Sequence, residues 1–142
     1  MNRRLSSTVL LALVLSWTAL AQTQPPMREG NWEVTMKMSM AGINMELPET
    51  KQTHCVTADM IKDPQGAVPK GIGGSDCKVS DYKFAGSTAT YTVACTTPAP
   101  VTAVGQTKYN GAEAYTGTLS MDSNGQKMSI AYDAKRIGDC PK

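Results

Sequence analysis

Residues 32–40 have the sequence Trp-Glu-Val-Thr-Met-Lys-Met-Ser-Met, in which apolar and polar side chains alternate. Successive side chains of a β-strand point to opposite faces, so this stretch places its tryptophan, valine and methionines on one face and its polar residues on the other. A strand with this pattern covers a core on one side and meets water on the other. The stretch therefore predicts a half-buried strand and indicates a β fold.

Further strands are expected over 45–56, 77–84, 88–95, 101–109, 114–121 and 127–137. Asn110-Gly111 and Asn124-Gly125 are hairpin turn signals. Residues 57–62 predict at most one short helix, and the glycines and prolines of 64–76 predict a loop. About seven strands, joined mostly by short turns, predict an all-β fold: a single antiparallel meander that curls or forms an open barrel to cover its apolar face.

Two hairpins have a register that the sequence suggests. Gly86 is equally far from Cys77 and Cys95, so a hairpin folded there sets these cysteines opposite each other, within reach of a disulfide. The same register sets Asp81 opposite Tyr91. In the last hairpin we expect three opposed pairs: Met121 with Met128, Leu119 with Ile130, and Gly117 with Tyr132.

All four cysteines lie beyond residue 21. An even number of cysteines in a small exported chain predicts a disulfide framework. With Cys77–Cys95 assigned to the hairpin, the remaining bridge is Cys55–Cys140, which ties the last residues to the first pair of strands.

The first 21 residues have the pattern of a secretory signal peptide. Arg3 and Arg4 precede the apolar run 9–15, and Ala19-Leu20-Ala21 forms a cleavage site. An uncleaved N-terminal anchor is the alternative, but the apolar run is short for a membrane span of about 20 residues. We expect a cleaved signal peptide over 1–21, a flexible lead-in over 22–29, a single β domain over 30–142, and a periplasmic or secreted bacterial protein that does not span the membrane.

Charge excludes one class of partner. The formal net charge of the chain is +2, and it falls to zero without the signal peptide, because Arg3 and Arg4 are lost. A neutral domain without a run of like charges lacks the basic surface that nucleic acids require. We therefore expect no nucleic-acid partner.

The expected core is short of large aliphatic residues. Beyond the signal peptide only Leu47 and Leu119 are leucines, and the chain has a single phenylalanine. We expect methionines to fill the gap, although methionine packs irregular space without specifying it closely. The result is a weakly filled, methionine-lined concavity that could admit an apolar guest.

Catalytic and metal-binding patterns are few. The only histidine, His54, adjoins a cysteine assigned to a disulfide, and neighbouring strand residues face opposite ways, so the two make a poor nucleophile–base pair. We expect no enzyme and no cofactor, and we interpret His54 as a strand residue on a solvent-facing side. Met36, Met38 and Met40 share a strand face, and their thioethers, together with His54, are candidate ligands for Cu(I). Their phase with Trp32 also fits simple core packing.

Several short motifs occur in order along the chain: Gly30-x-Trp32-Glu33-Val34-Thr35, Cys55-Val56-Thr57, Asp76-Cys77 with Cys95, Tyr115-x-Gly117, and Arg136-x-Gly138-Asp139-Cys140. Together they resemble domain of unknown function family 3617 (DUF3617), a family of small exported bacterial proteins. The resemblance implies a secreted or periplasmic, disulfide-bonded β protein. It implies no activity, substrate or catalytic residue.

These observations lead to three hypotheses for function. The first is a non-enzymatic binding module for an apolar or amphipathic ligand, which requires a cavity of about 300 Å³ or more. The second is an interaction module of the cell envelope, which would use the loop 64–76 or an open sheet edge. The third is Cu(I) binding by the methionine cluster.

Overall fold

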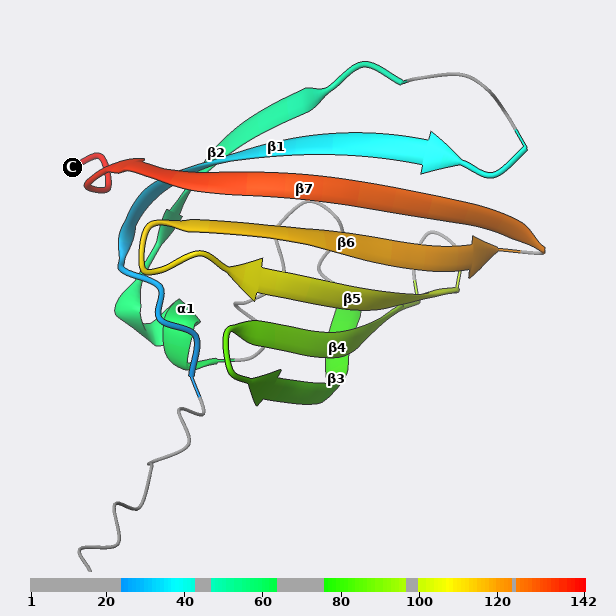
Figure 1. Ribbon diagram of the computed structural model, residues 1–142, viewed down its shortest axis with the longest axis horizontal. Helices are drawn as coiled ribbons and strands as arrows, with labels where there is room; N and C mark the ends of the chain where they lie inside the picture. Colours follow the sequence, from blue (N-terminus) through cyan, green and yellow to red (C-terminus); the bar gives the residue numbers. More distant parts are fainter. Residues whose placement is uncertain (1–23, 43–46, 64–75, 97–99, 124) are drawn as a thin grey trace, which may run out of the picture.

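The computed structural model describes residues 24–42, 47–63, 76–96, 100–123 and 125–142 (Figure 1). Seven strands and one short helix are present in these ranges: β1 (Gly30–Met40), β2 (Thr50–Val56), α1 (Ala58–Lys62), β3 (Cys77–Ala85), β4 (Thr88–Cys95), β5 (Val101–Tyr109), β6 (Ala114–Ser123) and β7 (Gln126–Gly138). The predicted signal peptide, and most of the predicted loop 64–76, lie outside the described residues. The predicted second strand begins at Thr50 rather than at residue 45.

The strands form one antiparallel sheet in the order β2-β1-β7-β6-β5-β4-β3. Consecutive strands are neighbours except β2 and β3, and the first hairpin is attached to the last strand through the pairing of β1 with β7. The sheet curls without closing, so that β2 and β3 are its two edges (Figure 1). The fold is therefore an all-β antiparallel meander in the form of an open, curled sheet.

The helix begins with a capping interaction that the sequence explains. Thr57 has an extended backbone, and its hydroxyl accepts a hydrogen bond from the backbone N–H of Met60. No helix in the described part of the chain is long and apolar enough to cross a membrane.

Aromatic and aliphatic residues, rather than methionines, make up the buried core on the inner face of the sheet. Trp32 and four of the five tyrosines are buried, and the Trp32 and Tyr115 rings lie 5.3 Å apart. The seven methionines of the described residues are all at least partly exposed. The expectation that methionine fills the core is therefore wrong, because large aromatic side chains supply the volume that leucine and phenylalanine do not.

Two glycines make room for two of these rings. Gly105 stands opposite Tyr91, and Gly117 stands opposite Tyr132, so a Cβ at either glycine would overlap the facing ring. The two tyrosine hydroxyls meet at 2.9 Å, and the hydroxyl of Thr107 lies 2.6 Å from that of Tyr132. A hydrogen-bonded polar group of this kind satisfies buried hydroxyls that would otherwise destabilise the core.

The hairpin of β3 and β4 contains an irregularity. Cys77 pairs with Cys95 and Val79 with Val93, but the register shifts by one residue between Ser80 and Lys83. Asp81, with a positive φ of 52°, lies in this bulge and does not pair with Tyr91. The uniform register expected here is wrong beyond Ser80, because a bulge inserts one extra residue into β3. In the β6–β7 hairpin, the three predicted pairs are present.

Two disulfides and an N-terminal segment hold the sheet in place. Cys77–Cys95 joins β3 to β4, and Cys55–Cys140 joins β2 to the segment after β7. Residues 25–29, interpreted above as a flexible lead-in, pack against the domain: Met27 contacts the core, and the backbone N–H of Arg28 donates to the carbonyl of Ala112 at 3.0 Å.

We expect the stability of the protein to fall steeply above about pH 10, where tyrosine ionises in an unfolded chain. Burial raises the pKa of Tyr109, Tyr115 and Tyr132 well above this value. Above pH 10 the unfolded chain therefore binds fewer protons than the native one, and each tyrosine lowers the free energy of unfolding by up to about 1.4 kcal/mol per pH unit. Tyrosinate absorbance and circular dichroism, followed together, test this. Ionisation of all five tyrosines near pH 10 with native circular dichroism would contradict it.

We expect the Cys55–Cys140 bridge to contribute more stability than the Cys77–Cys95 bridge. The two bridges close loops with sequence separations of 85 and 18 residues. Loop entropy then gives about 4 to 5 kcal/mol for the first and about 3 kcal/mol for the second. Urea unfolding of the two double-alanine variants measures both values. The reverse order of the two losses would show that loop entropy does not dominate here.

Candidate functional site

Methionines gather at the end of the sheet where β1 ends and β6 turns into β7, on the right of Figure 1. Met40 of β1 stands opposite Met128 of β7, and Met128 stands opposite Met121 of β6. Met38 lies two residues before Met40 and so shares its face. Residues that are distant in the sequence thus meet as neighbours on the inner face.

A groove of about 350 Å³ opens at this place. It is lined by Met36, Met38, Pro48, Thr50, Gln52, Met121, Met128 and Ile130, which we call the methionine groove. These lining residues include no charged side chain. Four thioether side chains and one isoleucine make the groove mainly apolar, while the residues of β2 and the segment before it add a hydroxyl and an amide.

A second hollow of about 570 Å³ adjoins the methionine groove at the end of the sheet. Met121 and Met128 line both, and Met40 lines the second. Asp122 and Lys127, which stand opposite each other, give this second hollow a polar margin. Because Asp122 and Lys127 alternate with Met121 and Met128 along their strands, they belong to the outer face of the sheet, so the second hollow opens mainly on that face.

Exposure shows that the methionines line a surface. Met38 is 37% exposed, and Met36 contacts both clusters of the core from a partly buried position. Methionine has an unbranched, polarisable side chain that adapts to different partners. The cluster therefore presents flexible apolar side chains at the surface.

His54 lies away from this cluster. It pairs with Trp32, four residues before Met36 on β1, and it does not line the methionine groove. It also shares the inner face with Trp32 and is partly buried, so its interpretation as a solvent-facing residue is wrong. The structure thus brings Met36 and Met38 together in the groove, places Met40 beside it, and leaves His54 outside.

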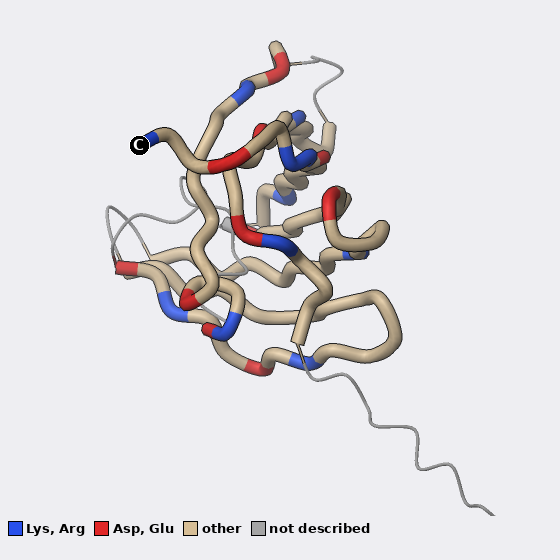
Figure 2. The backbone as a smooth tube through the Cα atoms, turned by 90° about the vertical axis from the view of Figure 1, so that its left-hand side faces the viewer, with Lys and Arg blue, Asp and Glu red and all other residues tan. Residues whose placement is uncertain are grey.

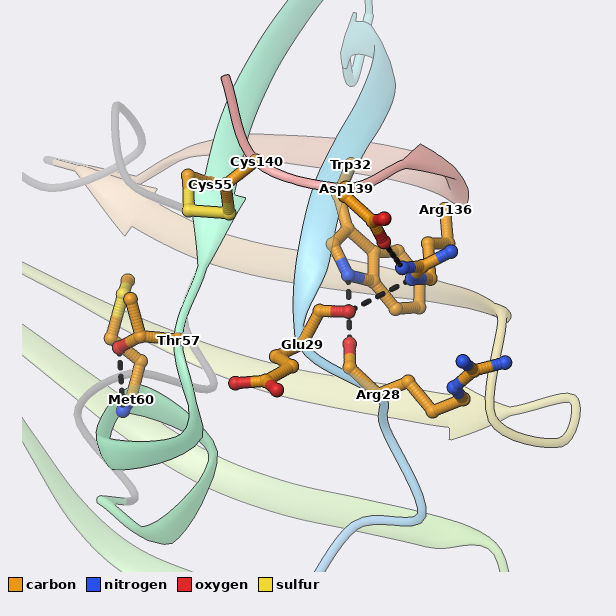
Figure 3. Close-up of a disulfide and its surroundings, with 9 residues drawn as sticks. All are labelled: Arg28, Glu29, Trp32, Cys55, Thr57, Met60, Arg136, Asp139 and Cys140. Atoms are coloured by element: carbon orange, nitrogen blue, oxygen red, sulfur yellow. Dashed lines mark hydrogen bonds and ion pairs between the residues drawn. A yellow bond between two sulfur atoms is a disulfide. The ribbon is translucent and has the colours of Figure 1, made fainter. Parts of the chain in front are cut away.

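The opposite end of the sheet is fastened by polar contacts and a disulfide (Figure 3). Arg136, whose side chain is 14% exposed, donates from Nε to the backbone carbonyl of Glu29 at 2.8 Å and forms an ion pair with Asp139. The indole N–H of Trp32 donates to the carbonyl of Arg28 at 3.1 Å. We call this set of contacts, together with Cys55–Cys140, the clasp.

Gly30 is required for the clasp. A Cβ at this residue would lie 2.5 Å from Nε of Arg136, and the backbone has a positive φ of 142°. The bare backbone of Gly30 leaves space for the guanidinium group, which joins the segment before β1 to the segment after β7. Several motif residues quoted above, among them Gly30, Trp32 and Arg136, lie at this end, where they hold the fold together.

A hollow of about 590 Å³ also lies at the clasp, lined by Met27, Arg28, Glu29, Gly30, Val56, Thr57, Ala58, Ile61, Arg136, Asp139 and Cys140. The largely buried guanidinium group of Arg136 already contacts the backbone carbonyl of Glu29 and the carboxylate of Asp139. Arg28 pairs with Glu113 at 2.8 Å. Both arginines that line this hollow therefore already have acidic partners within the fold.

Elsewhere the described residues show little that could perform chemistry. They contain no free cysteine and no group of three or more histidine, cysteine, aspartate or glutamate residues that could hold a metal ion. Basic and acidic residues are interspersed along the backbone (Figure 2). That the protein is not an enzyme stays a prediction.

Sequence reasoning found only part of the groove. The alternation in residues 32–40 identified Met36, Met38 and Met40, but Pro48, Thr50 and Gln52 carry no local signal of their role. Met121 and Met128 had a signal, since the expected register of the last hairpin places them opposite each other. What was missing was the pairing of β1 with β7, which brings Met40 beside Met128.

Comparison with known proteins places the chain in a family. No curated protein and no solved structure matches it significantly. The family model described as "Protein of unknown function (DUF3617)" matches residues 27–140, which include all seven strands and both disulfides. The chain therefore belongs to the DUF3617 family.

Proposed function

We propose that the protein is a non-enzymatic binding module that holds one apolar or amphipathic small molecule in the methionine groove. The observation that carries this proposal is the partial exposure of the methionines beside a core of buried aromatic and aliphatic residues. A residue at the surface that has no role in the core is more often polar. A group of exposed apolar side chains therefore indicates a binding surface.

The size and charge of the groove limit the ligand. Its volume of about 350 Å³ is at the lower end of the range for small-molecule sites. Because the groove lining has no charged side chain, a charged group buried there would lose its hydration without gaining a partner. The ligand's apolar part is therefore expected inside the groove, and any charged head group outside it, in water.

An exported location supports a carrier or sensor of this kind. Two disulfides are typical of proteins that leave the reducing cytoplasm. The signal-peptide pattern of residues 1–21 points the same way. We propose that the protein acts in the bacterial periplasm or is secreted, where small apolar molecules need a protein host to cross water.

An interaction module of the envelope is the second candidate, and the edge of β2 favours it. β3 is an edge interrupted by a bulge, whereas β2 pairs with β1 in a regular register from Thr50 to Val56. Regular edges can accept a further strand from a partner, while bulged edges resist it.

The groove predicts that Met38→Glu weakens ligand binding and leaves the fold intact. The substitution introduces a charge beside the ligand's apolar part, and we expect the dissociation constant to rise at least about tenfold, or about 1.4 kcal/mol. The measurement is fluorescence titration with the neutral apolar dye N-phenyl-1-naphthylamine, after native mass spectrometry of the purified protein to detect any retained molecule.

Ile137→Glu is the matched control. Ile137 is also an exposed apolar residue, 53% accessible, but it does not line the methionine groove. This variant should bind the dye as the wild-type protein does. Equal losses in both variants, or a wild-type protein that neither retains a molecule nor binds the dye, would contradict the proposal and favour the interaction module.

A further inference from the structure

Three methionines stand in one row across three adjacent strands. Met40, Met128 and Met121 come from β1, β7 and β6, and each is the direct register partner of the next. Opposed residues on neighbouring strands have Cβ atoms about 4.5–5.5 Å apart. Their flexible side chains can therefore turn their sulfur atoms toward a common point above the central residue, Met128.

The row is accessible from solvent. All three of its members are partly exposed, and Met121 and Met128 line the methionine groove, where Met38 lies close by as a fourth thioether. An ion entering from outside would therefore meet several sulfur atoms at once. Hard ligands are few at this place, since no carboxylate among the described residues lines the methionine groove.

Thioether sulfur is a soft, neutral ligand that selects Cu(I) and similar ions over Zn²⁺, Ca²⁺ or Mg²⁺. Stronger soft ligands do not compete within the described residues, because every cysteine there is in a disulfide. His54, the only histidine of the chain, lines neither hollow. A site at the row would therefore consist of sulfur atoms alone.

We propose that Met40, Met121 and Met128 bind one soft monovalent cation of the Cu(I) class, with Met38 as a further ligand. The site uses the sulfur atoms of this surface, whereas the proposed binding of an apolar molecule uses its apolar area. Leucine keeps the apolar area of methionine and removes its sulfur, so substitution of methionine by leucine tests the ion site directly.

The test is titration of the purified, disulfide-intact protein with Ag(I), a soft ion that does not change its oxidation state, in chloride-free buffer. Calorimetry and native mass spectrometry should show one tightly bound ion that excess Zn²⁺ does not displace. In the triple variant M40L/M121L/M128L we expect the affinity for Ag(I) to fall at least about 100-fold. The far-UV circular dichroism and the urea midpoint of this variant should match those of the wild-type protein, which shows that the lost affinity does not come from unfolding.

Two control variants locate the ion. Met27→Leu removes a thioether at the clasp, and His54→Ala removes the imidazole, so both should bind Ag(I) as the wild-type protein does. Retention of Ag(I) by the triple variant, or an equal loss in either control, would overturn the site. A wild-type protein that binds Ag(I) but does not bind the dye would overturn the proposed function and leave the cation site standing.

Discussion

β1 pairs with β7 from Asn31 to Met40, and the arrangement of the rest of the molecule depends on this contact. It attaches the first hairpin to the last strand, so the sheet curls back on itself and its break lies between β2 and β3. It also brings Cys55 close enough to Cys140 for a disulfide, since β2 lies beside β1. At the other end the same pairing places Met40 beside Met128. One strand pairing thus builds both the clasp and the methionine row.

The two ends of the curled sheet have different physical characters. At the clasp, a largely buried arginine, a disulfide and the indole of Trp32 hold three segments together, and Gly30 provides the space that this requires. In the middle, tyrosine rings extend over Gly105 and Gly117, and two of their hydroxyls join in hydrogen bonds. At the methionine end, partly exposed methionines of β1, β6 and β7 line the inner face, and the Cys77–Cys95 disulfide packs on the same cluster of buried residues as Met36 and Met121. The clasp is therefore held by polar contacts and a disulfide, whereas the groove is lined by flexible side chains.

Alternation of apolar and polar residues was enough to predict the fold class, because a half-buried sheet demands it wherever one face is covered. Local symmetry about Gly86 likewise gave the opposition of Cys77 and Cys95. The bulge at Asp81 could not be predicted, because a single extra residue leaves no trace in the composition of a short strand. The burial of tyrosine in place of methionine was also missed. Tyrosine is amphipathic, and its burial depends on the three-dimensional surroundings, such as the ring contacts of Tyr109 and the Thr107 hydroxyl beside Tyr132, which the sequence does not reveal.

The choice of methionine at the groove is itself informative. Leucine would present a similar apolar area, and the pleated sheet favours β-branched residues over methionine for packing alone. Both proposals give methionine a purpose that leucine lacks: adaptability for an apolar guest, and sulfur for a soft ion. They differ in which atoms matter, since the guest contacts the whole side chain while the ion needs only the sulfur. A row of three methionines on adjacent strands favours the sulfur, because adaptability alone sets no requirement on register, whereas a common ion requires that the sulfur atoms converge.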